Sequence, residues 1–224
     1  MLNLTKDEIN ARIAKNIAAL FNEAEDITVI NLGVGMPTQV SNYITNEKVF
    51  LQAENGMLGV GPIAVGDEID SQLINAGRQP VKMTPGCSFF DSTTSFAMIR
   101  GGHINATVLG AFEVDQDANV ANWIIPNGKM FGVGGAMDLV AGAKQVIIAM
   151  THTSKKGSKL IKKCTLPITG IGEVDIVMTE LGMFRFKDGK VILEKIAPEI
   201  DLDYIRSVTE LDYEVSPNLT QMVK

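Results

Sequence analysis

The sequence predicts an α/β fold in which a mixed sheet is flanked by helices. Strand-like segments alternate with helical segments, and several strand-like segments follow one another in the middle of the chain. In addition, the near-continuous apolar run at residues 145–150 is typical of a strand in a parallel sheet, buried on both faces. The 224 residues contain no linker, low-complexity segment or internal repeat, so we expect a single domain over residues 1–224.

The first expected element is a helix that begins close to residue 5. Thr5 and Glu8 have the spacing of a capping box, and Leu4 and Ile9 have that of a hydrophobic staple. Apolar residues then recur at helical spacing, at Ile9, Ile13, Ile17 and Phe21. This stripe is expected to pack against the sheet.

Residues 27–32 predict a strand that runs into a glycine turn and then a helix. The turn contains Gly33 and Gly35, and Pro37 suits the first turn of the following helix. Backbone N–H groups in such a turn can approach a ligand, and a helix N-terminus favours an anion. The turn lacks the third glycine of the dinucleotide fingerprint, so we expect no nicotinamide or flavin cofactor.

A carboxylate stands where a short apolar strand ends. Residues 49–51 predict the strand, and Asn55 and Gly56 allow the chain to turn sharply just after Glu54. Ligands of open α/β sheets bind at the carboxyl ends of strands, where a partly desolvated carboxylate is suited to nucleophilic catalysis. The motif alone also fits a turn-capping glutamate in a surface loop, since Asn-Gly turns are common.

The remaining chain is expected to be rich in strands. We expect an irregular segment at 66–78, a strand at 81–84, and an alternating strand at 104–115 with 120–125 as its neighbour. Residues 131–140 repeat the glycine turn that leads into a helix, so that two glycine loops would face one cleft. The strands at 145–150 and 176–178, a hairpin around 187–190 and a helix at 203–211 complete the chain.

The composition excludes several classes of function. A net charge of −6 argues against general binding to nucleic acid, and no stretch of apolar residues is long enough for a membrane span. The N-terminal segment lacks a secretory signal, so we expect a cytoplasmic protein. Cys87 and Cys164 are expected to be reduced core cysteines, and His103 and His152 lack the spacing of metal ligands, so no metal is assigned.

Five lysines within nine residues form the one basic cluster. This cluster fits either the phosphates of a nucleotide-like ligand or a solvated helix face, and the second interpretation is favoured because lysine is usually exposed. Its members are Lys155, Lys156, Lys159, Lys162 and Lys163.

Four ordered motifs together resemble the B (β) subunit of the family I CoA-transferases. Residues 51–59 (LQAENGMLG) resemble the family's Ser-Glu-Asn-Gly signature, and the resemblance extends to 31–38 (NLGVGMPT), 132–140 (GVGGAMDLV) and 163–170 (KCTLPITG). It covers nearly the whole chain. Ala53 stands where the family usually has Ser or Thr, and Met57 where it usually has another aliphatic residue.

The resemblance implies an α/β sandwich fold shared with certain sugar-phosphate isomerases, and a ping-pong transfer of coenzyme A. Glu54 would be the nucleophile that carries CoA as a glutamyl thioester. Gly134 or Gly135 would supply an N–H group to the oxyanion. No cofactor beyond the CoA thioester substrate is implied.

The resemblance also implies which residues line the substrates. Asn55, Gly56, Gly33 and Gly35 belong to the matched motifs and are expected to bind substrate. Arg78 lies in a segment where the family has a basic residue near CoA, although an exposed loop cation is an equally good interpretation.

The implied enzyme acts on acyl-CoA and short-chain carboxylic acids of the acetate, butyrate or acetoacetate type, together with a separate A subunit. One alternative is a 3-oxoacid or 3-oxoadipate CoA-transferase subunit, which would differ in the acid pocket. Alternatives of another class are a sugar-phosphate isomerase-like protein and a non-catalytic binding subunit. The glutamate in its turn argues against both.

Overall fold

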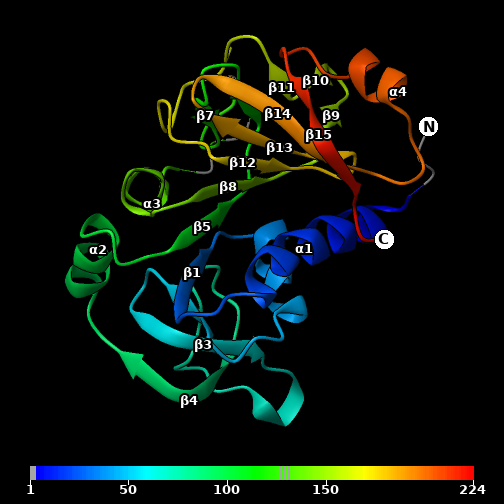
Figure 1. The fold of residues 1–224 in the computed structure, drawn as a ribbon. Helices are drawn as coiled ribbons and strands as arrows, with labels where there is room; N and C mark the ends of the chain where they lie inside the picture. The colour runs from blue at the N-terminus through cyan, green and yellow to red at the C-terminus, as the bar shows by residue number, and fades with distance from the viewer. Residues whose placement is uncertain (1–3, 127, 129, 131) are drawn as a thin grey trace.

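A computed structural model describes residues 4–126, 128, 130 and 132–224 and contains a 10-stranded sheet (Figure 1). The order across the sheet is β15 (Glu214–Gln221), β14 (Lys190–Ile196), β13 (Gly182–Lys187), β12 (Ile176–Met178), β8 (Val146–Ala149), β5 (Ala106–Leu109), β1 (Thr28–Leu32), β2 (Val49–Ala53), β3 (Met57–Ile63) and β4 (Val81–Phe89). Strands β2, β1, β5, β8 and β12 pair in parallel, antiparallel pairs extend the sheet on both sides, and the edge strand β15 pairs in parallel with β14. The predicted mixed, largely parallel sheet is therefore confirmed.

Helices cover both faces of the parallel strands. In β8, Val146 and Ile148 join the core beneath α2 (Ser92–Arg100) and α3 (Ala136–Gly142), whereas Ile147 and Ala149 join the core beneath α1 (Lys6–Asn22) and the 3-10 helix η1 (Met36–Tyr43). Alternate residues of one strand thus enter two hydrophobic cores, which explains its continuous apolar sequence. Figure 1 shows α2 and α3 side by side at one edge, well away from α1.

The first helix begins and packs as its sequence predicts. The Thr5 backbone N–H donates to Glu8 Oε2 at 2.7 Å and the Glu8 N–H donates to Thr5 Oγ1 at 3.3 Å, so the capping box is confirmed. Ile13, Ile17 and Phe21 are buried against the sheet. The same helix binds the other end of the chain through Asn16, whose side chain exchanges two hydrogen bonds with the backbone of Val223.

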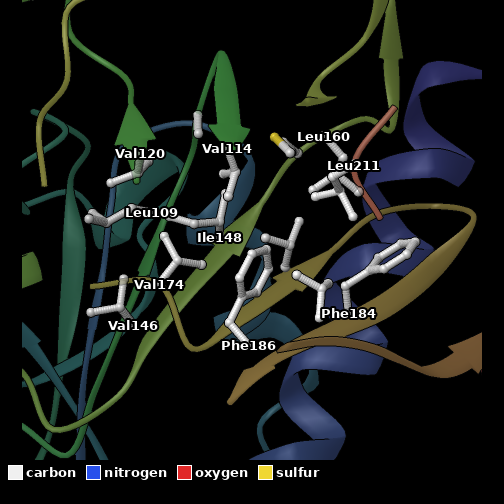
Figure 2. Close-up of a cluster of buried hydrophobic side chains, with 14 of the residues drawn as sticks. Leu109, Val114, Val120, Val146, Ile148, Leu160, Val174, Phe184, Phe186 and Leu211 are labelled. Carbon is white, nitrogen blue, oxygen red and sulfur yellow. The ribbon is translucent and has the colours of Figure 1, made fainter. Parts of the chain in front are cut away.

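The expected strand at 104–115 is wrong in one respect, because the chain leaves the main sheet after β5. Residues Ala106–Leu109 are buried throughout rather than alternately, and β6 (Glu113–Asp115) lies in a separate sheet between β7 (Val120–Ala121) and β11 (Leu160–Ile161). This small sheet packs over the main one. Figure 2 shows Val114, Val120 and Leu160 facing Ile148, Phe184 and Phe186 in the shared core.

Several other expectations need correction. The predictions missed α2, whose N-cap Asp91 accepts a hydrogen bond from Thr94 N–H at 2.8 Å, and they also missed β15. The last helix is α4 (Leu202–Ser207). It is shorter than the predicted helix at 203–211, and Thr209 and Leu211 lie after its end. The glycine turn at 131–140 and its helix are present, although Phe131 lies outside the described residues.

The lysine cluster does not form a helix face. It spans the short strands β9 (Thr153–Ser154), β10 (Gly157–Ser158) and β11, and Lys155 and Lys156 form the turn of the β9–β10 hairpin. Four of the five lysines are exposed, and the fifth, Lys159, is half-buried.

Other expectations concern the cysteines and the membrane. Cys87 and Cys164 are free thiols, as predicted, but both are half-buried rather than part of the core. Across residues 4–126, 128, 130 and 132–224, no helix has the length and apolar character needed to cross a membrane.

His152 is a fully buried histidine that should make stability depend on pH. Its ring nitrogens contact Thr179 Oγ1 at 3.0 Å and Thr209 Oγ1 at 2.9 Å. Burial, and then the nearby charge of Lys159, lower the pKa of His152 to about 4. Between this value and the ordinary pKa of about 6.5, the unfolded chain binds more protons than the folded one.

We therefore expect the free energy of unfolding to fall as the pH drops from 6.5 towards 4, and His152→Gln to flatten this dependence. Urea titrations at several pH values in this range measure the effect. Glu180, which accepts a hydrogen bond from the His152 backbone N–H, has a pKa raised by burial. Its titration therefore raises the free energy of unfolding as the pH drops, and it does so equally in the variant and in the unmodified chain. Equal slopes for the variant and the unmodified chain would show that His152 does not titrate on unfolding.

Candidate functional site

Glu54 lies in the tight turn between β2 and β3, at the carboxyl end of β2. The turn is closed by a hydrogen bond from Gly56 N–H to Ala53 O at 3.0 Å. Gly56 has φ +121°, and a Cβ atom there would lie 2.0 Å from the backbone oxygen of Phe90. Only glycine fits this position, which explains why the sharp turn after Glu54 was predictable.

The sheet topology puts this turn where ligands usually bind. Strand β1 is flanked by β2 on one side and β5 on the other, so the chain reverses its direction of progress across the sheet at β1. Open α/β sheets bind ligands outside the carboxyl ends of the strands at such a switch point. Glu54 follows β2 and the Gly33–Gly35 loop follows β1, both at this edge.

A chain of buried polar side chains leads to the carboxylate. Asn31 Nδ2 donates to Glu54 Oε2 at 3.1 Å and to Gln52 Oε1 at 2.7 Å. Gln52 Nε2 in turn donates to Ser95 Oγ at 2.8 Å. Asn31 and Gln52 are registered neighbours on β1 and β2, and Ser95 comes from α2.

Asn31, Gln52 and Ser95 were not among the site residues predicted from the sequence. Asn31 and Gln52 interrupt mostly apolar strands, TVINL and VFLQA, close to their carboxyl ends. Polar residues in buried strands require partners, and this is the signal that would have identified them. Ser95 carried no such signal, because its helix was not predicted.

The second glycine loop meets the carboxylate from α3. A Cβ atom on Gly135 would lie 3.4 Å from Glu54 Cγ and 3.2 Å from the ring of Phe96. Helix α3 is held there by close packing on α2, since a Cβ on Gly142 would lie 2.4 Å from Ile99 O. Within the described part of the chain, neither the Gly134 nor the Gly135 N–H has a hydrogen-bond acceptor.

The first glycine loop presents its backbone differently from the expectation. Gly33 N–H donates to Val108 O at 2.8 Å, so it continues the pairing with β5 and is not free for a ligand. Gly35 is exposed, has φ +92° and precedes η1, as the sequence predicted for the start of this helix. The expected role of these glycines in substrate binding stays a prediction.

Asn55 lies in the Glu54 turn and contacts the segment between β3 and β4, which carries Arg78. Asn55 Nδ2 donates to Ile74 O at 2.9 Å, and a Cβ on Gly77 would lie 3.6 Å from Val34. Arg78 is exposed, with φ +62°, and makes no ion pair with the described residues. The segment therefore contacts both the Glu54 turn and the Gly33–Gly35 loop and displays one cation beside them.

The part of the chain that the structure describes holds no group of three His, Cys, Asp or Glu side chains arranged to bind a metal ion. A cleft of about 550 Å³ lies instead along β2 and β3, lined among others by Ser41, Val49, Leu51 and Pro85. Glu54 does not line it. Its side chain lies with those of Asn31 and Gln52, on the face covered by α2.

Comparison with known proteins gives concordant matches. The sequence profile of the family described as Coenzyme A transferase matches residues 13–207. The beta chain of the acetate CoA-transferase of Haemophilus influenzae is 49% identical over 212 residues, which cover 94% of this chain and 93% of that protein. The B subunit of the succinyl-CoA:3-ketoacid coenzyme A transferase of Helicobacter pylori is 44% identical over 194 residues, 86% of this chain and 94% of that protein.

A solved structure is similar as well. The acyl-CoA transferase of Escherichia coli O157:H7, in a thioester complex with CoA, superposes with a TM-score of 0.72 at 25% identity. The match covers 99% of this chain and 44% of that one.

The contact between Gly56 and Phe90 yields a stability prediction with a matched control. Gly86 has φ +82°, similarly unfavourable for other residues, but the space beside it is open. We expect Gly86→Ala to lower the free energy of unfolding by about 1–2 kcal/mol, the usual strain of this backbone region. Gly56→Ala adds a clash with a backbone oxygen and should cost roughly 1–3 kcal/mol more.

Urea unfolding of the two variants measures this difference. Equal losses would mean that the turn at Gly56 can move away from Phe90 without cost, and that Glu54 is held less firmly than the contact indicates.

Proposed function

Because the chain belongs to the coenzyme A transferase family and is an enzyme of that class, we propose that it transfers CoA between short-chain carboxylic acids through a glutamyl-CoA thioester on Glu54. The observation that carries this proposal is the state of the carboxylate. Oε2 accepts a hydrogen bond from Asn31, whereas Oε1 has no hydrogen-bond partner among the described residues and is free to attack.

The proposed reaction needs no proton transfer from the protein. A carboxylate oxygen of Glu54 attacks the carbonyl carbon of acyl-CoA, and the C–S bond breaks to release the CoA thiolate and leave a mixed anhydride. The thiolate then attacks Cδ of Glu54, and the bond from Cδ to the bridging oxygen breaks, so that the donor acid leaves as its carboxylate with that oxygen. The acceptor carboxylate reverses both steps.

Negative charge develops on the substrate carbonyl oxygen in the first attack. A free backbone N–H next to the nucleophile is the usual means of stabilising it. Gly135 is favoured for this role over Gly134, because Gly135 packs against Glu54 Cγ whereas the space beside the Gly134 α-carbon is open.

The acids and the partner follow from the relatives. Similarity to the beta chain of an acetate CoA-transferase supports acetate as one substrate, and similarity to the 3-ketoacid enzyme supports an acetoacetate-type acid. Butyrate and 3-oxoadipate stay predictions from the sequence, as does the cytoplasmic location. The family and enzyme class give no support to a sugar-phosphate isomerase-like or non-catalytic subunit.

We propose a separate A subunit as the partner, because the relatives that match this chain over nearly their full length are named as B or β subunits. The A subunit would supply the remaining walls of the CoA site. Asn55 and Gly56 directly follow the nucleophile in the chain, and we propose that they contribute to the same site together with Gly35 and Arg78.

The test of the nucleophile is covalent trapping. The complex of this chain with its A subunit, incubated with acetyl-CoA and no acceptor, should carry CoA, and hydroxylamine should convert the loaded residue to a hydroxamate that peptide mass mapping places on Glu54. Glu54→Ala should abolish both trapping and transfer. Glu47→Ala, which removes an exposed carboxylate shortly before β2, should leave both unchanged. Hydroxamate on another residue, or transfer by Glu54→Ala near the normal rate, would contradict the mechanism.

A second test separates the two glycines. Gly135→Ala brings a methyl group against Phe96 and Glu54, and we expect it to lower kcat by roughly 10²-fold because the donor and the nucleophile are displaced together. Gly134→Ala faces open space and should mainly cost stability, since Gly134 has φ +52°. Steady-state kinetics and thermal unfolding of both variants distinguish these effects. A larger loss of kcat in Gly134→Ala would assign the donor to Gly134.

A further inference from the structure

We propose that Asn31 is a second oxyanion donor, which stabilises the intermediates centred on Glu54 Cδ, and that Gln52 and Ser95 are positioning residues for its amide. This inference rests on the proposed function, because it assigns a role in the half of the reaction that takes place at the enzyme's own carboxyl group.

The proposed reaction passes through two kinds of tetrahedral centre. When Glu54 attacks acyl-CoA, the negative charge collects on the substrate oxygen, on the side of Gly135. When the CoA thiolate attacks the anhydride at Cδ, the charge collects on an oxygen of Glu54 itself. A donor for that second oxyanion has to be fixed beside the glutamate, and Asn31 Nδ2 lies 3.1 Å from Oε2.

The contact also determines which glutamate oxygen takes which role. Oε1 has no partner among the described residues and becomes the bridging oxygen of the anhydride, while Oε2 stays hydrogen-bonded to Asn31 as the carbonyl oxygen. In the attack of thiolate on Cδ, the C–S bond forms and the electrons of the C=O bond move onto Oε2. They return as the bond from Cδ to the bridging oxygen breaks and the donor acid leaves with that oxygen.

The orientation of the Asn31 amide follows from its surroundings. Three oxygens lie within hydrogen-bonding distance of Nδ2: Gln52 O at 3.2 Å, Gln52 Oε1 at 2.7 Å and Glu54 Oε2 at 3.1 Å. A flipped amide would set its own oxygen against all three. With the Gln52 oxygen engaged by Asn31, the Gln52 amide nitrogen points to Ser95 Oγ at 2.8 Å.

Packing alone does not account for an asparagine at this position. Asn31 and Ser95 are 0% exposed and Gln52 is 2% exposed. Within the described residues, Asn31 Oδ1 is buried and has no hydrogen-bond partner, so the side chain retains an unsatisfied acceptor. Such a group costs free energy of folding, about 1–3 kcal/mol by mutational measures. A donor aimed at the nucleophile is the gain that offsets this cost.

The experiment isolates the Cδ-centred step. The complex with the A subunit is loaded from acetyl-CoA, freed of excess ligand and treated with hydroxylamine. The hydroxylamine nitrogen attacks Cδ, the C–S bond breaks, and CoA leaves with a proton as the hydroxamate forms. The oxyanion of this reaction lies on the glutamate oxygen, so Asn31→Ala should slow CoA release by roughly 10²-fold, the usual effect of removing one oxyanion donor.

Matched variants exclude a merely structural effect. Asn16 is also 0% exposed and makes three hydrogen bonds, so Asn16→Ala should lower thermal stability and leave the release rate unchanged. Gly135→Ala should slow loading but not release from thioester already formed. Gln52→Met should slow release less than Asn31→Ala does, because the donor remains but is no longer held.

The carbonyl stretch of the thioester gives a readout independent of rate. The loaded-minus-unloaded infrared spectrum isolates this band, and loss of the Asn31 hydrogen bond should move it to higher wavenumber. In Gln52→Met the band should broaden. Release rates and band positions that match the unmodified enzyme in Asn31→Ala would overturn the inference and leave the proposed function intact. Absence of any thioester in the unmodified complex would overturn both.

Discussion

The parallel pairing of β1 with β2 and β5 is the constraint on which the arrangement of the site depends. It sets Gln52 opposite Asn31 and Asn31 opposite Thr107, so that three polar side chains form one row across the middle of an apolar sheet. A shift of the register by one residue would turn Asn31 towards the core beneath α1 and replace it with Ile30 or Leu32. The pairing that builds the hydrophobic core therefore also fixes the donor beside Glu54.

The location of the nucleophile could be predicted from the sequence because local chemistry determines it. The apolar run of β2 and the Asn-Gly pair define a strand followed by a sharp turn, and the contact of Gly56 with Phe90 shows why no other residue fits. The capping box at Thr5 and the near-continuous apolar run of β8 were predictable for the same reason. In each case a few neighbouring residues carry the whole signal.

The surroundings of the nucleophile could not be predicted in the same way. Asn31, Ser95 and Gly135 lie 23, 41 and 81 positions from Glu54 by residue number, and only the sheet register and the packing of α2 on α3 bring them together. The break after β5 was missed because 104–115 carries apolar residues throughout, although its two halves enter different sheets. Sequence spacing along one strand does not reveal where the chain changes sheets.

The hydrogen bonds between Asn16 and Val223 affect the order in which parts of the molecule can fold. Helix α1 is made early in synthesis, yet the buried Asn16 side chain cannot form its hydrogen bonds to Val223 until β15 has emerged and paired with β14. Until then, the helix can lie on β1 and β5 but is not tied at its buried polar position. Such late, long-range closure slows folding relative to folds with local contacts. It also means that the parallel strands can be assembled before the sheet's far edge ties the two ends of the chain together.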